Sequence, residues 1–375
     1  LTGLHTCSGT MWPRLQLVIL ICILVCCLVS LALLVALCNV GFDSGPQKLL
    51  QVPAALPHHD LAWLAWKNRL NISFYTIEEE FYRHGVWRKN MEYIRQHNAK
   101  YAAGAVLYRM RENQFTHMEH WEFVERHLRS RVEDANEFSD YVFSEGNETL
   151  ALDDAYAHGN CSSTSMDWRS LSSGSTIKNQ RECGACWAFA TATVIEWHWA
   201  IKMNSTLAVS RQQMVDCVKS NFGCNGGLLE NALAYAHSSG LMSDTDYPYR
   251  SRVTQCKYDP KRLVLRLKGF EKLSKLKETS LTCILRVKGP IVIGFDASGR
   301  GLQHYDTGLF TDLDCDAEYL NHAVVLVGYG VDTAGRKYWI AQNSWSREWG
   351  EDGFFRILLG ENHCGVAVTP LIPVL

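Results

Sequence analysis

The sequence lacks an excess of charge of either sign. Its 375 residues include 37 Lys and Arg against 39 Asp and Glu, which gives a formal net charge of -2 at pH 7. Proteins that bind nucleic acid or other polyanions through their overall charge are strongly basic, so the composition predicts no such partner. The sequence also contains no internal repeat, and its 47% hydrophobic residues suffice for two or three globular units.

Cysteine, in contrast, is abundant. The chain has 14 Cys, which is many for a reducing cytosol and typical of a protein that folds in an oxidising compartment. Four N-glycosylation sequons support the same destination, because these acceptors are used in secreted proteins. Their asparagines are Asn71, Asn147, Asn160 and Asn204.

A long apolar run lies near the N-terminus, at residues 15–40. As a helix, residues 17–37 would span about 31 Å, which matches a hydrocarbon core of about 30 Å. The apolar core of a cleaved signal peptide is usually about 7–15 residues long. The run therefore favours a signal anchor, with residues 1–14 as a cytoplasmic tail in a type II orientation, while a cleaved signal peptide stays open. Both alternatives deliver the chain to the secretory lumen.

Composition divides the rest of the chain into four parts. We expect a luminal linker at 41–59, a helical unit rich in Trp and His at 60–128, and an acidic linker with the maturation region at 129–163. The last unit, 164–375, is interrupted by glycines and carries most of the remaining cysteines. Its first part is typical of helices and its second part of strands, which indicates an α+β fold.

Cys186 is the first residue that suggests chemistry. It stands at the start of an almost entirely apolar segment that ends near Met203 and is typical of a buried helix. The N-terminus of a helix carries partial positive charge, which favours a thiolate over a thiol. Cys186 is therefore a candidate nucleophile.

A nucleophilic thiolate needs a base, and His322 is the candidate. It opens one strand, and residues 337–343 form a second strand candidate after a turn near Asp332. A hairpin centred near residues 332 and 333 would place His322 opposite Asn343, within a register slip of one or two residues, so that the side chains meet. An amide beside the imidazole gives the orientation that a nucleophile and its base require.

The Cys183 and Cys186 pair admits two other interpretations. A dithiol redox pair of the thioredoxin type normally lies near a βαβ pattern, which this segment lacks. A zinc site would need a second Cys or His pair at matching spacing, and Cys217 and Cys224 are separated by six residues. We therefore expect no metal and no cofactor.

The segment from Gln180 to Phe189 resembles the nucleophile segment of the papain family of cysteine proteases. His322 and Asn343 follow Cys186 in the order of that family. The similarity continues in several short motifs, which are Cys224-Asn225-Gly226-Gly227, Tyr247-Pro248-Tyr249, Gly289-Pro290, Asn321-His322-Ala323, Asn343-Ser344-Trp345 and Trp349-Gly350. This resemblance covers about residues 60 to 375.

The resemblance implies a papain-like fold with a helical lobe, a β-barrel-like lobe and a catalytic site between them. Cys186 would be the nucleophile, His322 the base and acid, Asn343 the amide that orients the histidine, and Gln180 an oxyanion-hole donor. Substrate contacts would come from Gly226, Gly227, Leu228, Leu229, Ala297, Leu320, Ala323, Trp345 and Thr369. These side chains carry no charge, which implies a preference for a hydrophobic residue second upstream of the cut.

The resemblance also organises the cysteines. It implies three disulfides, Cys183–Cys224, Cys217–Cys256 and Cys315–Cys364, and leaves Cys186 unlinked. Cys161 and Cys283 remain without an assigned role. Because Cys283 lies in an expected helix that ends before Gly289, we interpret it as a buried structural thiol.

The helical unit at 60–128 carries a second pattern. Six residues, spaced three or four positions apart, lie along one side of the expected helix. They are Glu79, Arg83, Trp87, Asn90, Ile94 and Asn98. The pattern resembles the inhibitory propeptide of cathepsin L-like enzymes. In the segment that aligns with the family's acid-sensing region, Arg111 replaces a glycine and His117 replaces an aspartate. We therefore consider a pH switch at His117, with a solvated surface histidine as the alternative.

Together these similarities imply a cathepsin L-like cysteine endopeptidase, made as an autoinhibited zymogen with a helical inhibitory propeptide, and the apolar run adds an expected N-terminal signal-anchor helix. Its partners would be peptide and protein substrates, its own propeptide and cystatin-type inhibitors, in an acidic lysosome-like compartment or outside the cell. The alternative is a catalytically silent, membrane-anchored homologue that acts as a binding or inhibitory ectodomain. The presence of all four implied catalytic residues favours the enzyme.

Overall fold

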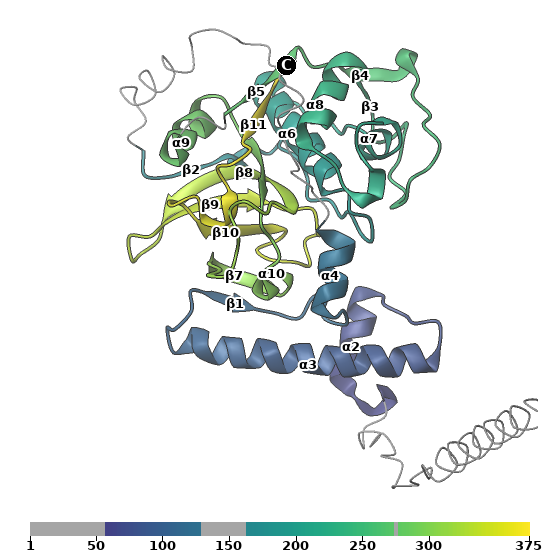
Figure 1. Cartoon of the computed structure of the whole chain (residues 1–375), viewed down its shortest axis with the longest axis vertical. Helices are drawn as coiled ribbons and strands as arrows, with labels where there is room; N and C mark the ends of the chain where they lie inside the picture. The colour runs from purple at the N-terminus through teal and green to yellow at the C-terminus, as the bar shows by residue number, and fades with distance from the viewer. Residues whose placement is uncertain (1–56, 129–162, 274–276) are drawn as a thin grey trace, which may run out of the picture. The chain divides into compact units, whose positions relative to one another are not determined.

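The computed structural model describes residues 57–128, 163–273 and 277–375 (Figure 1). The apolar run at 15–40 and the sequons at Asn147 and Asn160 lie outside these residues. Within the described part of the chain, no helix is both long and apolar enough to cross a membrane.

Of the described residues, 57–64 belong to one compact unit and those from Ala65 onward to a second. In the first unit, η1 (Pro57–His59) precedes α2 (Leu61–Leu70), a helix that continues into the second unit. Asp60 begins this helix, because its Oδ1 accepts hydrogen bonds of 3.1 Å from the N–H groups of Ala62 and Trp63. All elements described below belong to the second unit.

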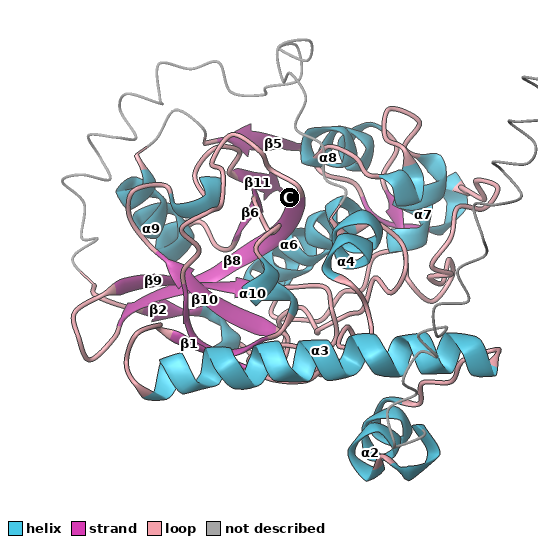
Figure 2. Ribbon diagram, turned by 60° about the horizontal axis from the view of Figure 1, so that its bottom comes forward, coloured by secondary structure: helices cyan, strands magenta, loops and turns pink. Residues whose placement is uncertain are grey.

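The longest helix is α3 (Ile77–Ala102), which Figure 2 shows running past the sheet. It begins where the Thr76 side chain accepts a hydrogen bond from the N–H of Glu79, and three glutamates in its first turn suit the positive end of the helix dipole. Two shorter elements follow it, β1 (Tyr108–Met110) and α4 (His120–His127).

One side of α3 carries the pattern expected from the sequence. Arg83 lies 2.6 Å from Glu122 of α4, and Asn90 donates to the carbonyls of Thr116 and Met118 at 2.9 Å. Asn98 bonds both backbone groups of Met110, at 2.9 Å each. The side chains at this spacing therefore tie α3 to the segment that runs from β1 to α4. Trp87 and Ile94 are buried beside these polar anchors.

The helical lobe is built around α6 (Cys186–Met203), with α7 (Arg211–Cys217) and α8 (Leu229–Ser238) beside it. Most of α6 is buried, as its apolar sequence predicts. Its one acidic side chain, Glu196, is 2% exposed and forms two hydrogen bonds of 2.8 Å with Arg211, which is 1% exposed. A buried carboxylate is stable here because it is paired and fully hydrogen-bonded.

The second lobe is formed by a nine-stranded sheet in the order β1-β7-β10-β9-β8-β6-β11-β5, with β2 paired to β8. A two-stranded sheet of β3 and β4 lies apart from it. The strand bounds are β2 Met166–Asp167, β3 Leu241–Met242, β4 Leu263–Leu265, β5 Gly269–Lys272, β6 Ile291–Phe295, β7 Tyr305–Phe310, β8 His322–Val331, β9 Lys337–Gln342, β10 Phe354–Leu358 and β11 Leu371–Val374. The remaining helices are α9 Glu278–Val287, α10 Arg300–Gln303, η4 Trp168–Ser170, η5 Gly223–Asn225, η6 Pro260–Arg262 and η7 His363–Gly365.

The edge strand of this sheet is β1, which belongs to the helical N-terminal segment that also contains α3 and α4. β1 pairs antiparallel with β7, with Tyr108 opposite Gly308 and Arg109 opposite Thr307 (Figure 1). Gly308 has a φ of 108°, and a Cβ at this position would lie 2.5 Å from the Leu107 carbonyl oxygen. Only glycine therefore fits this close pairing.

The β8–β9 hairpin corrects the expected register. Val331 pairs with Lys337 and Tyr329 with Trp339, so the turn is centred on residue 334 rather than near 332 and 333. A shift between Leu326 and Gly328 then changes the pairing by one residue. The difference arises because the turn is longer than expected, with Asp332 accepting hydrogen bonds from two of its backbone N–H groups.

Three disulfides link the cysteine pairs that the family resemblance implies. These are Cys183–Cys224, Cys217–Cys256 and Cys315–Cys364. Cys283 is buried in α9, as expected, but it is disulfide-bonded, so the expectation of a buried structural thiol is wrong. A thiol and a half-cystine cannot be distinguished by the apolar pattern of a helix, because both are small and hydrophobic.

Candidate active site

Cys186 is the first residue of α6 and has no solvent exposure. It is the one cysteine in the described residues that is not part of a disulfide. Ala185 precedes it without a side-chain cap, so the N–H groups of the first turn are not covered by a capping side chain. Partial positive charge at this helix end favours the thiolate form of the sulfur.

His322 begins β8, a strand that packs against α6. Its Nε2 lies 2.9 Å from Oδ1 of Asn343, which confirms the predicted contact despite the shifted register. Trp345 stacks on the imidazole with ring centroids 4.6 Å apart and is itself fully buried. The indole therefore covers the contact between the histidine and the amide.

Burial lowers the pKa of His322 to about 4, and the hydrogen bond that its Nε2 donates to Asn343 Oδ1 opposes this shift. In this covered state the imidazole is neutral near pH 7. Among the described residues its Nδ1 has no hydrogen-bond partner. The ring is therefore held through one nitrogen and leaves the other available for proton transfer.

Gln180 joins the two lobes at the same point. Its Oε1 accepts a hydrogen bond of 2.6 Å from Ser344 Oγ, and its backbone N–H donates to the Ser344 carbonyl at 2.8 Å. The Tyr249 hydroxyl donates to the Gln180 carbonyl at 2.8 Å. These contacts fix the amide so that its two N–H groups point to the space beside Cys183.

The helical N-terminal segment fills that space. Gln180 Nε2 donates to the carbonyl of His127, the last residue of α4, at 3.2 Å and to the Cys183 carbonyl at 3.1 Å. Phe123 meets the Trp345 ring edge-on with centroids 5.2 Å apart. A backbone carbonyl of the chain's own segment thus accepts from the donor that the sequence assigns to the oxyanion hole.

Several hydrogen bonds hold this segment on the sheet lobe. Asn113 donates to the Gln303 carbonyl at 2.8 Å, and Gln114 donates to the Trp345 carbonyl at 2.6 Å. Arg109 and Arg111 both form ion pairs with Asp306 of β7, with N–O distances of 2.5 and 3.0 Å. The helical N-terminal segment is therefore held over the site by specific polar contacts.

Several histidines in or against this cover have lowered pKa values. Burial is the main cause that lowers the pKa of His117 to about 4 and the pKa of His127 to about 3, with nearby cations or His322 adding to the effect. Burial likewise lowers the pKa of His304 to about 3, and neither of its ring nitrogens has a hydrogen-bond partner among the described residues. Each group is therefore buried in its neutral form.

His117 packs inside the helical N-terminal segment. Its ring packs against Trp66 and Phe74, with centroids 5.5 and 5.6 Å away, and its carbonyl accepts from Arg83 at 3.5 Å. These partners all belong to the helical segment. His117 thus stabilises the fold of the cover itself rather than its contact with the peptidase lobes.

The apolar residues assigned to substrate binding come together in part. Gly294 of β6 pairs with Ala323, and a Cβ added to Gly294 would lie 3.2 Å from Thr369 and 3.3 Å from Leu320. Ala297 is buried two residues after β6. Four others lie on the helical lobe, where Gly226 and Gly227 are buried and Leu228 and Leu229 lead into α8.

Of the four sequons, two fall on described residues. Asn71 and Asn204 are both exposed and both have positive φ angles, 52° and 48°. Such left-handed positions at helix ends are ones that asparagine tolerates. Both side chains are therefore accessible for modification.

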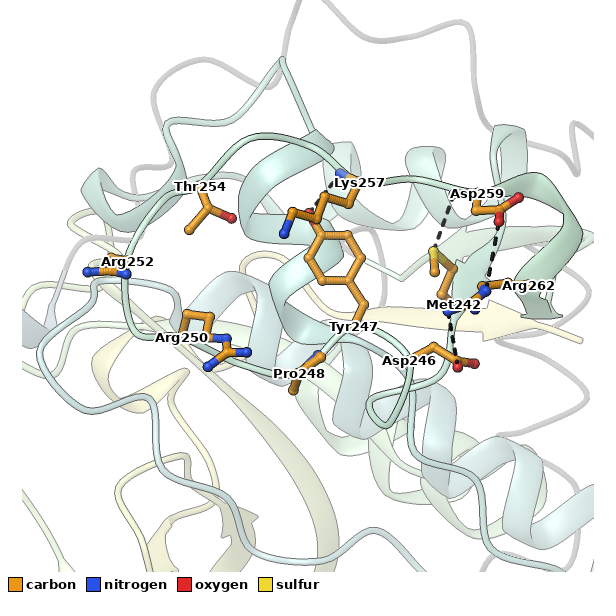
Figure 3. A pocket seen from close by; sticks show the side chains of 10 residues that line it. All are labelled: Met242, Asp246, Tyr247, Pro248, Arg250, Arg252, Thr254, Lys257, Asp259 and Arg262. Carbon is orange, nitrogen blue, oxygen red and sulfur yellow. Dashed lines mark hydrogen bonds and ion pairs between the residues drawn. The ribbon is translucent and has the colours of Figure 1, made fainter.

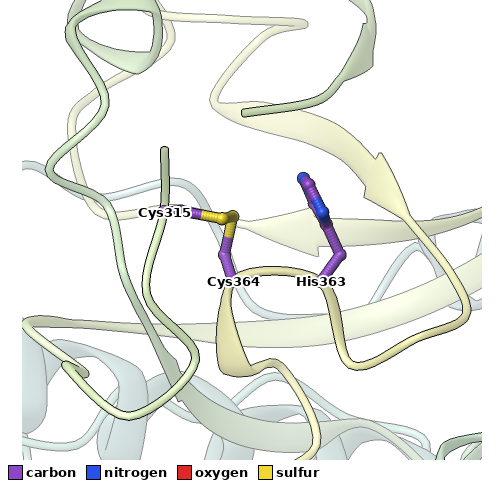
Figure 4. Close-up of side chains that lie close together, drawn as sticks. All are labelled: Cys315, His363 and Cys364. Atoms are coloured by element: carbon purple, nitrogen blue, oxygen red, sulfur yellow. A yellow bond between two sulfur atoms is a disulfide. The ribbon is translucent and has the colours of Figure 1, made fainter. Parts of the chain in front are cut away.

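One cluster has the composition of a metal site but cannot act as one. Ligand atoms of Cys315, His363 and Cys364 lie within 4.8 Å of one another (Figure 4). Both sulfur atoms are used in the disulfide, and His363 Nε2 accepts a hydrogen bond from the Asp312 N–H at 3.1 Å. A metal needs thiolate ligands, which this pair does not offer.

Sequence reasoning missed two contributors to the site. Ser344 was seen only as part of a motif, yet its hydroxyl holds Gln180. His127 gave no signal at all, because its position at the site follows from how α4 docks and not from any local pattern.

The fold and the covered cysteine site define a cysteine peptidase in its zymogen form. The model of the papain family of cysteine proteases matches residues 162–374, and that of the cathepsin propeptide inhibitor domain matches residues 63–123. This chain belongs to the papain family. Its helical N-terminal segment is the inhibitory propeptide.

Named relatives agree with this assignment. The chain is 34% identical to cathepsin L2 of Homo sapiens over 329 residues, which cover 86% of this chain and 94% of the relative. It is 32% identical to digestive cysteine proteinase 1 of Homarus americanus, covering 85% of this chain and 96% of the relative. It resembles the solved digestive procathepsin L2 of the Tenebrio molitor larval midgut with a TM-score of 0.76 and 33% identity, covering 84% and 99% of the two chains.

Proposed function

We propose that this cathepsin L-like endopeptidase cleaves peptides with Cys186 as nucleophile and His322 as its base and acid. The Cys186 thiolate attacks the scissile carbonyl carbon, and the oxyanion accepts hydrogen bonds from Gln180 and from the Cys186 backbone N–H. His322 then gives its proton to the leaving amine as a thioester forms. Water hydrolyses the thioester while His322 takes up a proton, and Cys186 is released.

One observation carries this proposal. Oδ1 of Asn343 lies 2.9 Å from Nε2 of His322, and the fully buried Trp345 covers this contact. His322 begins a strand that packs against the helix starting at Cys186. A silent homologue would have no need for this orientation. The comparisons do not favour the silent alternative either.

The direct test is chemical labelling. The purified zymogen is incubated in acid with an epoxide probe that reacts with thiolates, and the labelled residue and new N-terminus are identified by mass spectrometry. We expect label on Cys186 only after a cut in the region 129–163. A Cys186→Ala variant mixed with active wild type is the control, and it should be cut but remain unlabelled. Label elsewhere would contradict the assignment.

We further propose that the substrate residue second upstream of the cut is hydrophobic. Leu320, Ala323 and Thr369 gather around Gly294 and carry no charge. Burying an apolar side chain there is favourable, whereas an unpaired guanidinium is costly to bury. We expect peptides with Leu, Val or Phe at this position to have kcat/KM values roughly 10- to 100-fold above the Arg peptide.

The matched variant for this prediction is Thr369→Asp, which adds a carboxylate to the same pocket. It should raise the kcat/KM of the Arg peptide relative to the Leu peptide. Peptide libraries measured with both enzymes, after titration of their active sites, give the comparison. A wild-type profile led by Arg would refute the assignment of the pocket.

The lowered pKa values of the histidines in the propeptide predict that the zymogen is activated in acid. His117 has an ordinary pKa near 6.5 when solvated and about 4 in the folded propeptide. Because the folded pKa is the lower one, the stabilising effect is complete above about pH 6.5 and is lost as the pH falls toward 4. The propeptide should therefore loosen over this range.

Replacing His117 by Phe removes this titration and keeps an aromatic ring against Trp66. We expect the autoactivation midpoint of His117→Phe to fall by about 0.5 to 1 pH unit. His59→Phe, at an exposed residue of η1, is the control and should follow the wild type. The measurement is the rate of autoactivation against pH, and coincident curves for all three proteins would rule out the switch.

The setting of the enzyme is also a proposal. The apolar run 15–40 would anchor or direct the precursor to the secretory lumen, where Asn71, Asn147, Asn160 and Asn204 would be glycosylated. The mature enzyme would work in an acidic lysosome-like compartment or outside the cell, controlled by cystatin-type inhibitors. A decrease in the mass of the precursor after treatment with an N-glycan endoglycosidase tests the glycosylation. Extraction of the precursor with the membrane fraction tests the anchor.

A further inference from the structure

The ion pairs between the propeptide and the peptidase domain all have the same polarity within the described residues. In each pair the propeptide supplies an arginine and the peptidase domain supplies a carboxylate. The pairs are Arg69–Glu348, Arg109–Asp306, Arg111–Asp306 and Arg126–Glu182. The opposite arrangement, with a propeptide carboxylate on a peptidase cation, does not occur among these residues. The covered surface of the peptidase domain is therefore matched to positive charge.

Two of these carboxylates lie next to residues of the active site. Glu182 stands two positions after Gln180 and shortly before α6, the central helix of the helical lobe. Glu348 stands three positions after Trp345, in the loop between β9 and β10 of the sheet lobe. We call these two glutamates the acidic rim. The third carboxylate, Asp306, lies on the edge strand β7 and is not part of this rim.

The position of Arg126 indicates which part of the site the acidic rim borders. Arg126 lies 3.6 Å from Glu182 and directly precedes His127, whose carbonyl accepts from the oxyanion donor. Its helix, α4, also packs an aromatic ring on Trp345. The pocket proposed for the substrate residue second upstream of the cut is formed by other side chains, around Gly294. We therefore assign the rim to the part of the site that receives residues downstream of the cut.

Both glutamates of the rim remain accessible even in the zymogen. The side chains of Glu182 and Glu348 are 73% and 51% exposed, and each lies 3.6 Å from its arginine. Neither forms an ion pair with a described residue of the peptidase domain itself. Loss of the propeptide therefore leaves two exposed carboxylates beside the site without a partner for their charge.

Two cations lie next to these glutamates in the sequence. Arg181 precedes Glu182, Arg347 precedes Glu348, and both arginines are exposed. Among the described residues neither arginine forms an ion pair, and the propeptide places no carboxylate against them. The propeptide thus pairs with the glutamates of the rim and not with the arginines beside them.

Other exposed cations of the helical lobe lie apart from this surface. Figure 3 shows Arg250, Arg252 and Lys257 around a pocket of about 560 Å³, whose lining residues all fall between Met242 and Arg262. Within the described residues, none of these three cations forms an ion pair with the propeptide. The polarity of the pairs therefore reflects the local charge of the covered surface and not the total charge, which is near neutral.

We propose that the acidic rim binds arginine or lysine side chains of the substrate downstream of the cut. This inference rests on the peptidase function proposed above. Arg126 and Arg69 occupy the two carboxylates in the zymogen, and basic side chains of a substrate take their place in the mature enzyme. A guanidinium group suits this exchange because its N–H donors match the geometry of a carboxylate. The enzyme therefore favours protein segments that are basic after the scissile bond.

The preference should be graded rather than absolute. Exposed ion pairs each contribute little to binding and are weakened by salt. Two such pairs together should make kcat/KM for a basic substrate roughly 3- to 30-fold higher than for an acidic substrate of otherwise equal sequence. A substrate without charge at these positions should have an intermediate kcat/KM, because the nucleophile and the upstream pocket are the same.

Three quenched fluorescent peptides test the proposal on the activated enzyme. They share Leu at the position second upstream of the cut and carry Arg, Ala or Glu in the residues after it. At about pH 5.5, where glutamate side chains are generally ionised, we expect the Arg peptide to be cleaved best. In the double variant Glu182→Gln and Glu348→Gln, the ratio of kcat/KM between the Arg and Glu peptides should fall roughly 3- to 30-fold. Concentrated NaCl should lower the wild-type ratio in the same direction.

The control removes the same amount of charge elsewhere. Asp314→Asn and Glu361→Gln alter exposed carboxylates in the loop after β7 and just before η7. This double variant should keep the wild-type ratio within about twofold, because a change in net charge alone acts weakly across a screened surface. Active-site titration of all three proteins ensures that only folded, active enzyme is compared.

Each outcome of these measurements decides the proposal. A selective fall of the ratio in the rim variant supports it. An unchanged ratio in the rim variant overturns it, even if added propeptide inhibits that variant less, because the carboxylates would then serve the inhibitor alone. A wild type that cleaves the Glu peptide best also overturns it. If the wild type cleaves no peptide, the peptidase function fails and this proposal with it, whereas equal cleavage of all three contradicts this proposal alone.

Discussion

The Cys186→Ala protein is expected to lose peptide hydrolysis, with kcat/KM falling at least about 10⁴-fold. No other cysteine in the described residues is outside a disulfide, so no second thiol of the peptidase can substitute as the nucleophile. The same variant should accumulate as an uncut zymogen, because it cannot process itself. The measurement is hydrolysis of a fluorogenic peptide by purified protein after acid treatment.

Folding of this variant can be separated from its activity. Added wild-type mature enzyme should convert the Cys186→Ala zymogen to a fragment of mature size. Only a folded domain would survive this treatment. Undiminished hydrolysis by variant protein free of wild type would contradict the role of Cys186. A variant digested completely would indicate misfolding, and Cys186→Ser then provides the closer substitution.

Replacing Gln180 by Ala is expected to lower kcat about 10- to 1,000-fold with little change in KM, because an oxyanion donor acts mainly in the transition state. In the zymogen its Nε2 already donates to a carbonyl oxygen, that of His127, at 3.2 Å. The backbone of the propeptide thus uses the same donor that the reaction would use. Steady-state kinetics of the activated enzyme measure the effect.

Gln180→Glu is the matched variant for this prediction. It keeps the oxygen that accepts from Ser344 and the size of the side chain, but it removes the N–H donors. Its kcat should fall at least as far as that of Gln180→Ala. If Gln180→Glu were as active as the wild type, the side chain would serve to connect the lobes and not to stabilise the oxyanion.

Local patterns in the sequence sufficed for several parts of the site. The apolar run after Cys186 predicted the buried helix, and the spacing on α3 predicted the side that carries Arg83 and Asn90. The contact of His322 with Asn343 was predicted although the register was not. Side chains two positions apart across a hairpin still come within reach of each other. The contact between His322 and Asn343 therefore forms even though the strand register differs from the predicted one.

Other parts depend on contacts between distant segments. Nothing in the sequence near Tyr108 indicates that it pairs with Gly308, because a three-residue strand has too few residues for a period to appear. The position of His117 against Trp66 also depends on how α2 and α3 fold together. Such features follow from tertiary packing, which local propensity does not specify.

The pairing of β1 with β7 has a consequence for the mature enzyme. When the propeptide leaves, backbone N–H and C=O groups of β7 that bonded β1 become an open sheet edge, and such edges invite pairing between copies. Asp306 then loses Arg109 and Arg111 and remains on that edge as an unpaired charge. A charged side chain on an open edge discourages strand addition. The residue that anchors the inhibitor in the precursor would thus protect the mature protein from aggregation.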